Sequence, residues 1–414
     1  MKNKPRLLFI SPIAPQLTGN GLAMRAGTML EALSQDFKVS LLVVPISGNP
    51  GDHVNSDLEA CCSEVAKLEH GDLGNLFTRA CHHPLLWPLL GWLHRYPVEW
   101  RAITSRTIQK SYAIFKGRSF DRIHIFRTYM IPFARPYILA GTTTPSQVHL
   151  DMDDIESQTR TRLAELQPEG AKRKRLKQEA ADFENREQQC LSFCDHIYVC
   201  SKVDRQILSR RFPGYQNFHT VPNIIRLPET AAEKKVQSPF CFLFIANLAY
   251  PPNQDGLNWF IQAVLPILKK TAPGPFKVIL AGSGEWKGSI PLKSLPEFEV
   301  KGFVQDLEAL YNSCDASIAP IRVGGGTRIK ILESLAHKRP IITTSSGAEG
   351  LELESEILLG DTAPLFAAAC CRIMEDASLR KRLVDDGYKT VSSCYSPEVL
   401  LKTLREMKDK QISQ

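Results

Sequence analysis

The chain contains the stretch PIRVGGGTRIKILESLA at residues 320–336, and this stretch decides the fold of the second half. Three glycines lead directly into a segment in which apolar residues recur at helical spacing up to Ala336. Short apolar runs at 316–320 and 339–344 flank the helix and predict buried strands. We therefore predict one βαβ unit, with Thr327 as the helix cap.

The chemistry of this unit points to an anion. Glycine lets the backbone come close to a ligand, and a helix N-terminus attracts phosphate. Arg328 and Lys330 add two positive charges, and Glu333 lies about 9 Å along the helix from Thr327, at roughly 1.5 Å per residue. This spacing fits a phosphate and a ribose of one nucleotide. The alternative is an ordinary glycine-rich loop with a solvated Arg and Lys.

Composition sets the broad class. The 414 residues are 43% hydrophobic and 23% charged, as in a globular protein of two or three domains. No secretion signal is recognised at the N-terminus, and no apolar run approaches the ~20 residues of a membrane span. The eleven cysteines show no metal-ligand spacing. We predict a cytoplasmic protein with reduced thiols and no bound metal.

The net charge of +7 fits anionic substrates or an anionic membrane surface. No nucleic-acid motif is present, so we expect no nucleic-acid partner. Residues 84–96 are apolar with two tryptophans and a basic end, which fits either a peripheral membrane contact or a core segment interrupted by Pro88. The basic run 172–175 is either a solvated helix face or a contact with anionic lipid.

The first half of the chain has its own βαβ start. An apolar strand at 6–10 leads into the glycine-rich loop 15–21, a helix, and a second strand at 37–44. Gly19 and Gly21 alone are a weak signal, because the third glycine and the strand-end acid of a dinucleotide fingerprint are absent.

An acidic cluster ends the strand that begins at Gln147. Four carboxylates fall within six residues, and crowding of this kind indicates binding or acid–base work, or else the first turn of a helix. The cluster comprises Asp151, Asp153, Asp154 and Glu156. A charged helical hairpin, broken near 168–170, follows over 158–190.

The βα rhythm restarts after a polar segment. We predict an α/β chain with a first domain at 1–225, a linker at 226–238, a second domain at 239–395 and a C-terminal helix at 396–414 that packs back on the first domain.

Together these motifs resemble the family 4 retaining glycosyltransferases, in particular members that make bacterial surface polysaccharides. The resemblance covers nearly the whole chain and is strongest in FIAN at 244–247, AGSG at 281–284, KGFV at 301–304 and the segment from Gly324 to Glu333. It implies the GT-B fold, two Rossmann-like domains with parallel sheets facing a central cleft.

The resemblance also implies the reaction and its residues. A sugar would pass with retention, and without a metal, from a UDP- or GDP-linked donor to a glycan, lipid-linked or small-molecule acceptor. Asp153 or Asp154 would contact the acceptor or the sugar, and Arg328 and Lys330 would meet the charge on the diphosphate. The remaining expected donor-binding residues are Gly19, Gly21, Asn247, Gly282, Gly302, Phe303, Val304, Gly324, Gly325, Gly326, Thr327 and Glu333.

Departures from the family pattern leave alternatives open. Gly325 stands where members often carry the sugar-reading Glu of an E-x7-E motif, so the donor sugar is not identified. The alternative function is a non-catalytic nucleotide-sugar-binding protein of the same fold. A third alternative, a nicotinamide oxidoreductase, is disfavoured because the chain lacks the dinucleotide fingerprint. A fourth, a pyridoxal phosphate-dependent phosphorylase of the same fold, would need a Schiff-base lysine, and none can be picked out in the sequence.

Overall fold

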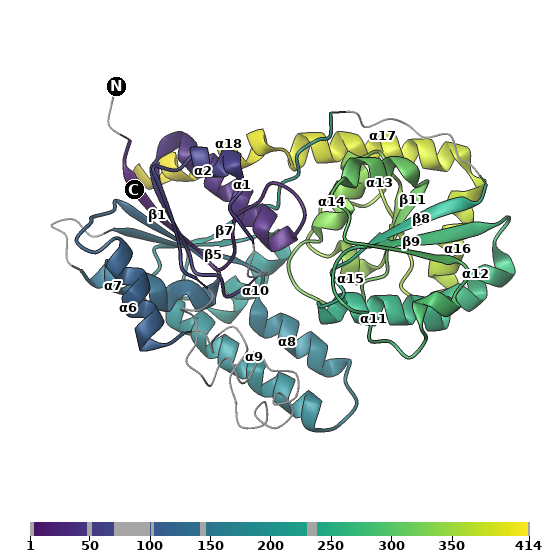
Figure 1. Ribbon diagram of the computed structural model, residues 1–414, viewed down its shortest axis with the longest axis horizontal. Helices are drawn as coiled ribbons and strands as arrows, with labels where there is room; N and C mark the ends of the chain where they lie inside the picture. Colours follow the sequence, from purple (N-terminus) through teal and green to yellow (C-terminus); the bar gives the residue numbers. More distant parts are fainter. Residues whose placement is uncertain are drawn as a thin grey trace. The chain divides into compact units, whose positions relative to one another are not determined.

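The protein is described by a computed structural model that covers residues 4–47, 52–69, 100, 103–140, 146–229 and 238–412. The chain folds as two compact units, Met1–Val221 and Pro222–Gln414 (Figure 1). The first unit ends four residues before the boundary that the sequence predicts. The membrane-contact prediction for 84–96 falls outside the described residues. No helix that the structure describes is long and apolar enough to span a membrane.

The first unit is a seven-stranded parallel sheet in the order β3-β2-β1-β4-β5-β6-β7. Its strands are β1 (Arg6–Ser11), β2 (Lys38–Val43), β3 (Glu64–Lys67), β4 (Arg122–Phe126), β5 (Gln147–Asp153), β6 (His196–Val199) and β7 (Phe218–Thr220). Its helices are α1 (Gly21–Asp36), α2 (Ser56–Ala60), α6 (Ser105–Ile114), η2 (Thr128–Met130), α7 (Ile131–Leu139), α8 (Glu156–Glu165), α9 (Ala171–Cys190) and α10 (Lys202–Arg211).

The second unit repeats this order with six parallel strands, β10-β9-β8-β11-β12-β13. Its strands are β8 (Phe240–Ile245), β9 (Phe276–Ala281), β10 (Phe298–Gly302), β11 (Ala316–Ala319), β12 (Ile341–Thr343) and β13 (Leu358–Leu359). Its helices are α11 (Pro251–Trp259), the π-helical η3 (Phe260–Val264), α12 (Leu265–Thr271), η4 (Leu292–Ser294), α13 (Leu307–Ser313), α14 (Ile329–Ala336), α15 (Ser345–Ala348), α16 (Ala363–Glu375), α17 (Ala377–Cys394) and α18 (Pro397–Ile412).

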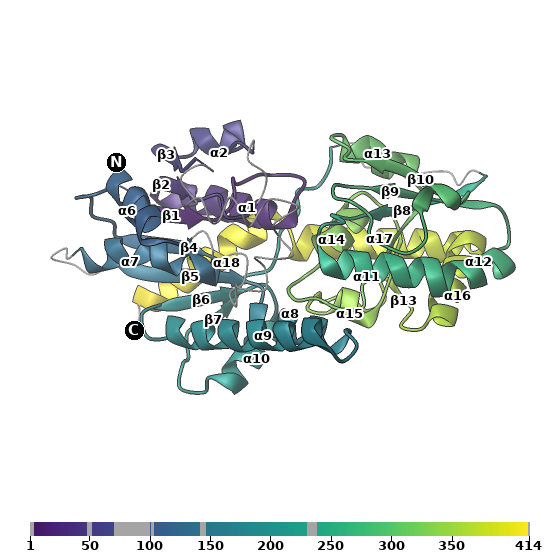
Figure 2. The ribbon, with the colours of Figure 1, turned by 60° about the horizontal axis from the view of Figure 1, so that its bottom comes forward.

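Both sheets are buried on two faces, which explains why their strands are continuous apolar runs. In β8, Phe242 and Phe244 pack with residues of α11, η3, α12 and α16, whereas Leu243 packs on the opposite face with residues of α13. Figure 2 shows α11 and α12 following one another along one face of this sheet. In β1, Ile10 joins a cluster with residues of α7 and α9.

The strand orders place a topological switch point in each unit. In the first sheet, β1 lies between β2, which follows it in the chain, and β4. In the second sheet, β8 lies in the same way between β9 and β11. Ligands of open α/β sheets bind outside the carboxyl ends of the strands at such points. In the second unit, this point falls between the segment after β8 and the glycine loop after β11.

The segment after β7 belongs to the second unit. The Nδ2 of Asn223 donates to Oγ1 of Thr327 at 2.7 Å, and the backbone N–H of Ile225 donates to the carbonyl of Tyr395 at 2.8 Å. These two bonds join residues 222–225 to the second unit. The predicted linker lies only partly within the described residues. The cleft and the packing of 396–414 on the first domain stay predictions.

Candidate functional site

The glycine loop after β11 is shaped by backbone conformations that favour glycine. Gly324 has φ +144° and Gly326 has φ +63°. A Cβ on Gly324 would lie 2.8 Å from Nη2 of Arg328, so a larger residue there would displace this guanidinium. The loop therefore depends on glycine at these positions, as the sequence suggests.

The helix cap predicted at Thr327 is wrong by one residue. Helix α14 begins at Ile329, and Arg328 is its N-cap residue, with no side-chain capping bond. Thr327 is buried and accepts the bond from Asn223 instead. Because Thr327 serves a tertiary contact, the helix N-terminus is left without a side-chain cap.

Arg328 folds back over its own loop. Its Nη1 donates to the carbonyl oxygens of Gly325 and Gly326, and its Nη2 is buried without a hydrogen-bond partner among the described residues. The guanidinium thus holds the loop in this conformation, and its Nη2 is a buried donor at the start of α14.

Lys330 lies two residues further along the chain, in the first turn of α14. Its Nζ donates to Oδ1 of Asn253 at 3.0 Å and stands 5.2 Å from the centre of the Phe244 ring. Burial, and to a smaller extent the charge of Arg328, lower the pKa of Lys330 to about 7, with Glu333 opposing the shift. An amine with a pKa of about 7 is partly charged at neutral pH, and a bound anion favours its fully charged form.

Asn253 joins the two sides of the switch point. Its Nδ2 donates to the carbonyl of Asn247 at 2.8 Å, and Oδ1 of Asn247 accepts from the N–H of Ala249 at 2.9 Å. Asn253 is buried, at the start of α11. The sequence analysis did not assign it a role, because nothing local shows that it meets Lys330 and Asn247.

Glu333 sits on the same helix as Lys330, buried to 7% exposure. Burial raises the pKa of Glu333 to about 7, and Lys330 opposes this rise. Buried carboxyls with strongly shifted pKa values cluster at functional sites. Glu333, on the helix that follows β11, is therefore a candidate for a binding role.

A backbone hydrogen bond joins the carboxyl ends of β9 and β10. The N–H of Gly282 donates to the carbonyl of Gly302 at 2.7 Å. A Cβ on Gly282 would lie 1.9 Å from the carbonyl oxygen of Ala246, so only glycine permits the contact. Phe303 is 75% exposed and Val304 is half-buried. The ring of Phe303 is thus an apolar surface free for a flat ligand.

Gly19 and Gly21 belong to the first unit. Gly19 has φ +94°, and Gly21 is the first residue of α1, after the cap Asn20 that accepts from the N–H of Leu22 at 2.9 Å. They follow β1, at the switch point of the first sheet. They belong to the first unit, whereas the other residues expected to bind the donor belong to the second unit.

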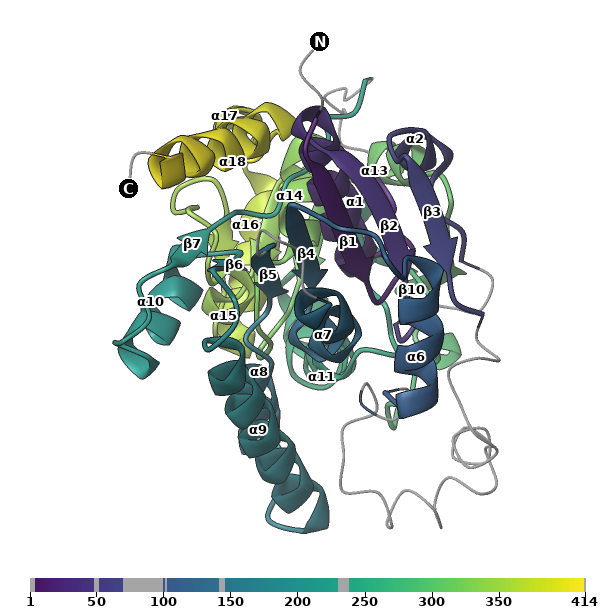
Figure 3. The same cartoon turned by 90° about the vertical axis from the view of Figure 1, so that its left-hand side faces the viewer.

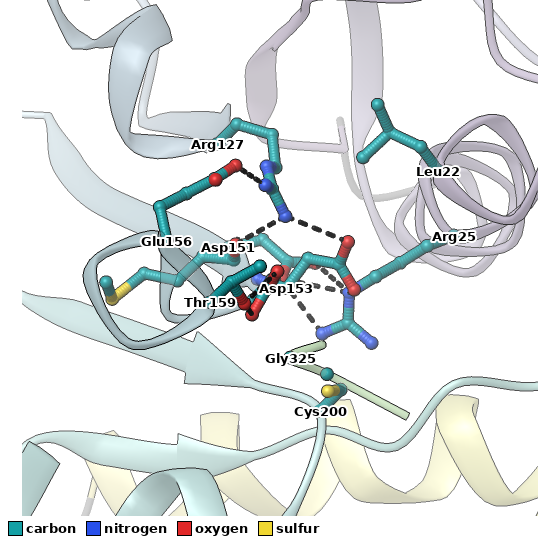
Figure 4. Close-up of polar contacts among 12 residues, drawn as sticks. Leu22, Arg25, Arg127, Asp151, Asp153, Glu156, Thr159, Cys200 and Gly325 are labelled. Carbon is teal, nitrogen blue, oxygen red and sulfur yellow. Dashed lines mark hydrogen bonds and ion pairs between the residues drawn. The ribbon is translucent and has the colours of Figure 1, made fainter. Parts of the chain in front are cut away.

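In the first unit, Arg25 and Asp151 form a buried ion pair (Figure 4). Nη2 and Nε of Arg25 donate to Oδ1 of Asp151 at 2.9 and 3.0 Å, and Nη1 donates to the carbonyl of Val221 at 3.0 Å. Burial alone would lower the pKa of Arg25, yet the carboxylates of Asp151 and Asp153 hold it above its ordinary value. The pair locks α1 to the carboxyl end of β5.

Asp153 is held between two arginines at the end of the same strand. Oδ1 lies 3.5 Å from Nε of Arg25, and Oδ2 lies 3.1 Å from Nη1 of Arg127, while Nη2 of Arg127 bonds Glu156 (Figure 4). The Asp153 side chain keeps 17% exposure. Both acids of the predicted pair are partly exposed, and Asp153 is the one held between two arginines. Asp154 instead accepts from Oγ1 of Thr159, with both oxygens at 3.0 Å.

Backbone strain marks this end of the sheet. Arg127 has φ +75° and Asp153 has φ +57°, and the pairing of β5 with β6 shifts register between Asp151 and Asp153. Positive φ in residues other than glycine costs free energy and clusters at functional sites, and bulges there re-aim side chains. The sequence analysis assigned no site role to Arg25 or Arg127, because nothing local shows that they meet the acids.

Comparisons with known proteins agree with this architecture. Residues 239–376 match the family described as glycosyl transferases group 1. A curated relative, an uncharacterized 44.6 kDa protein in the cps region of Klebsiella pneumoniae, is 23% identical over 172 residues, which is 39% of this chain and 44% of the relative. The chain thus spans less than half the length of that relative.

Two solved structures match over almost their whole length. Sucrose-phosphate synthase from Thermosynechococcus elongatus has a TM-score of 0.69 at 14% identity and covers 99% of this chain and 100% of its own. The TarM G117R mutant of S. aureus, in complex with Fondaparinux, alpha-GlcNAc-glycerol and UDP, has a TM-score of 0.64 at 10% identity and covers 97% and 99%. The chain therefore has the GT-B fold, and residues 239–376 of its second unit match the glycosyl transferases group 1 model.

Proposed function

We propose that the protein transfers a sugar from a nucleotide-diphosphate sugar to a hydroxyl of a glycan, lipid-linked or small-molecule acceptor, with retention and without a metal. The observation that carries this proposal is the group formed by the glycine loop, Lys330 and Glu333 at the switch point of the second unit. The family match of residues 239–376 supports it, as does the UDP bound to the similar TarM structure.

The donor end follows from the charges. The diphosphate lies against the loop from Gly324 to Thr327, where Lys330 and the buried Nη2 of Arg328 meet its oxygens. Negative charge grows on the leaving diphosphate as the glycosidic bond breaks, and fixed donors in a partly dry site stabilise it more than water does. Asn253 and Asn247 hold Lys330 in place for this role.

Glu333 accepts hydrogen bonds from the ribose hydroxyls, and the base lies against Gly302 and the exposed ring of Phe303. In the first unit, Asp153 contacts the acceptor or the transferred sugar, because its carboxylate is fixed by Arg25 and Arg127 and still accessible. Gly325 supplies no side chain to read the sugar. The donor sugar is therefore left to experiment.

The first experiment is a thermal-shift screen with UDP, GDP and their sugars, because a ligand of the native state raises the melting temperature with affinity and concentration. The second incubates the protein with a labelled form of the nucleotide-sugar that binds and with a bacterial lysate as the acceptor source. Transfer or slow hydrolysis supports an enzyme, and NMR of the product anomer tests retention. Binding with neither reaction would identify the non-catalytic alternative.

A further inference from the structure

Positive charge is concentrated in the helical hairpin of the first unit. Residues 157–178 contain seven Lys and Arg and two Glu, a net charge of +5, compared with +7 for the whole chain. Five of these cations fall within six residues at the start of α9, with no acid among them. We call this cluster the basic tip: Lys172, Arg173, Lys174, Arg175 and Lys177.

The hairpin presents the basic tip away from the sheet. Helix α9 packs with a buried stripe that includes Leu176, Ala180 and Phe183, while Lys172, Lys174, Arg175 and Lys177 are exposed. Figure 3 shows α9 running out from the strands of its unit, with its first turns at the far end. The basic tip is therefore accessible to a large flat partner.

The cations of the tip are only partly neutralised. Arg173 pairs with Glu169 at 2.6 Å and Arg175 pairs with Glu179 at 3.3 Å. Lys172, Lys174 and Lys177 form no ion pair with any residue that the structure describes. Cations nearer the sheet differ, since Arg186 stacks at 3.6 Å on the Trp100 ring and Arg160 lies 3.7 Å from Glu179. The uncompensated charge is thus at the end of the hairpin.

An apolar residue lies beside this charge. Leu166, in the turn between α8 and α9, is 37% exposed. Exposed lysines with a neighbouring exposed apolar side chain are the composition that attracts a protein to an anionic bilayer surface. Surfaces that bind single-stranded nucleic acid carry aromatics on which bases stack, and the tip has none.

We propose that the basic tip docks the protein on a bilayer surface rich in anionic phospholipid headgroups. Lys172, Lys174 and Lys177 contact the headgroups, and Leu166 reaches the edge of the acyl region. Neither contact involves a residue of the nucleotide site or of the acidic cluster. The proposal therefore stands or fails independently of the proposed function.

The test is flotation of the full chain with lipid vesicles, without nucleotide. We expect binding to phosphatidylcholine vesicles that contain about 30% phosphatidylglycerol and no binding to phosphatidylcholine alone. Binding should disappear at about 1 M NaCl, where charges more than ~3 Å apart are screened. Each lysine near an anionic surface contributes about fivefold, so K172Q/K174Q/K177Q should lower the partition coefficient about 100-fold.

A matched control keeps the net charge of that variant. K381Q/K389Q/K402Q removes three exposed lysines of α17 and α18 and should bind vesicles like the unchanged protein. Equal melting temperatures of both variants would establish that each is folded. Equal loss in both triples would overturn the assignment to the basic tip. Retention of the unchanged protein on heparin but not on vesicles would identify an acidic polymer as the partner and overturn the lipid proposal.

Discussion

Lys330 donates to Asn253 across the switch point of the second sheet, with Nζ 3.0 Å from Oδ1. The two residues come from different helices, α14 after β11 and α11 after β8. Asn253 in turn bonds the carbonyl of Asn247. This chain of bonds sets the position of an amine whose pKa is lowered to about 7, mainly by burial, and a bound diphosphate would favour its charged form.

Replacing both cations of the loop should abolish most turnover. In Arg328→Ala/Lys330→Ala, we expect kcat to fall ~100- to 1000-fold, since donors to a developing oxyanion contribute about this much. Stability should change little, because a lysine with a lowered pKa costs the folded state free energy at neutral pH. Initial rates and melting curves measure the two effects. Lys389→Ala, at an exposed site on α17, is the control, and unaltered kcat in the double variant would refute the assignment.

Asn253→Ala should act through Lys330. Loss of one hydrogen bond to a charged group costs about 1.5–3 kcal/mol, so UDP affinity should fall roughly 10-fold or more. The pH at which affinity begins to fall should also move down, because Lys330 loses a bond that favours its charged form. Calorimetry at several pH values measures both. Asn258→Ala, on the same helix and bonded to Gln262, should leave both unchanged.

Glu333→Gln should weaken nucleotide binding while it spares the fold. The carboxylate accepts from ribose hydroxyls in our proposal, and its loss should reduce UDP affinity ~10- to 100-fold. The folded pKa of about 7 lies above the ordinary value of 4.5. The carboxyl therefore lowers stability progressively between pH 4.5 and 7, and the full cost remains above pH 7, so the variant should melt at the same or a higher temperature at pH 8. Glu375→Gln, on the surface of α16, is the control. Tight UDP binding by Glu333→Gln would contradict the ribose role.

Nucleotide affinity should depend on pH through Lys330. Its pKa in the free protein is about 7, and a bound diphosphate raises this pKa because it favours the charged amine. Binding above pH 7 therefore takes up a proton, and affinity should fall by up to about tenfold per pH unit. Calorimetry in buffers of different ionisation enthalpy measures the proton. Lys330→Met should bind weakly at every pH, and an unchanged slope in this variant would argue against Lys330.

The two acids of β5 should separate stability from activity. Asp151→Asn removes one partner of a buried ion pair and leaves Arg25 uncompensated, which should cost about 3–5 kcal/mol of unfolding free energy. Asp153→Asn, at a partly exposed site, should change stability by about 1 kcal/mol or less yet lower turnover. Urea denaturation and initial rates measure the two effects. Asp154→Asn is the comparison variant. If it loses as much turnover as Asp153→Asn, the assignment of the acceptor or sugar contact to Asp153 alone is refuted.

The strands and the loops that follow them could be read from the sequence, because continuous apolar runs bounded by glycine have few other structures. The helical hairpin predicted at 158–190 is confirmed by α8 and α9. Its break near 168–170 is encoded locally, because Pro168 and Gly170 interrupt a helix. The prediction of Thr327 as the helix cap was wrong because the Thr327 hydroxyl accepts from Asn223, more than a hundred residues away. No local pattern contains that information.

The sequence by itself determined two α/β halves, a glycine loop entering a helix, and the cations and acids at the strand ends. These follow from hydrophobic periodicity and from the backbone freedom of glycine, which are properties of neighbouring residues. The tertiary structure alone decided which side chains meet: Lys330 with Asn253, and Arg25 with Asp151. The order of strands in a sheet sets these contacts, and long-range burial, rather than sequence spacing, sets the pKa values that go with them.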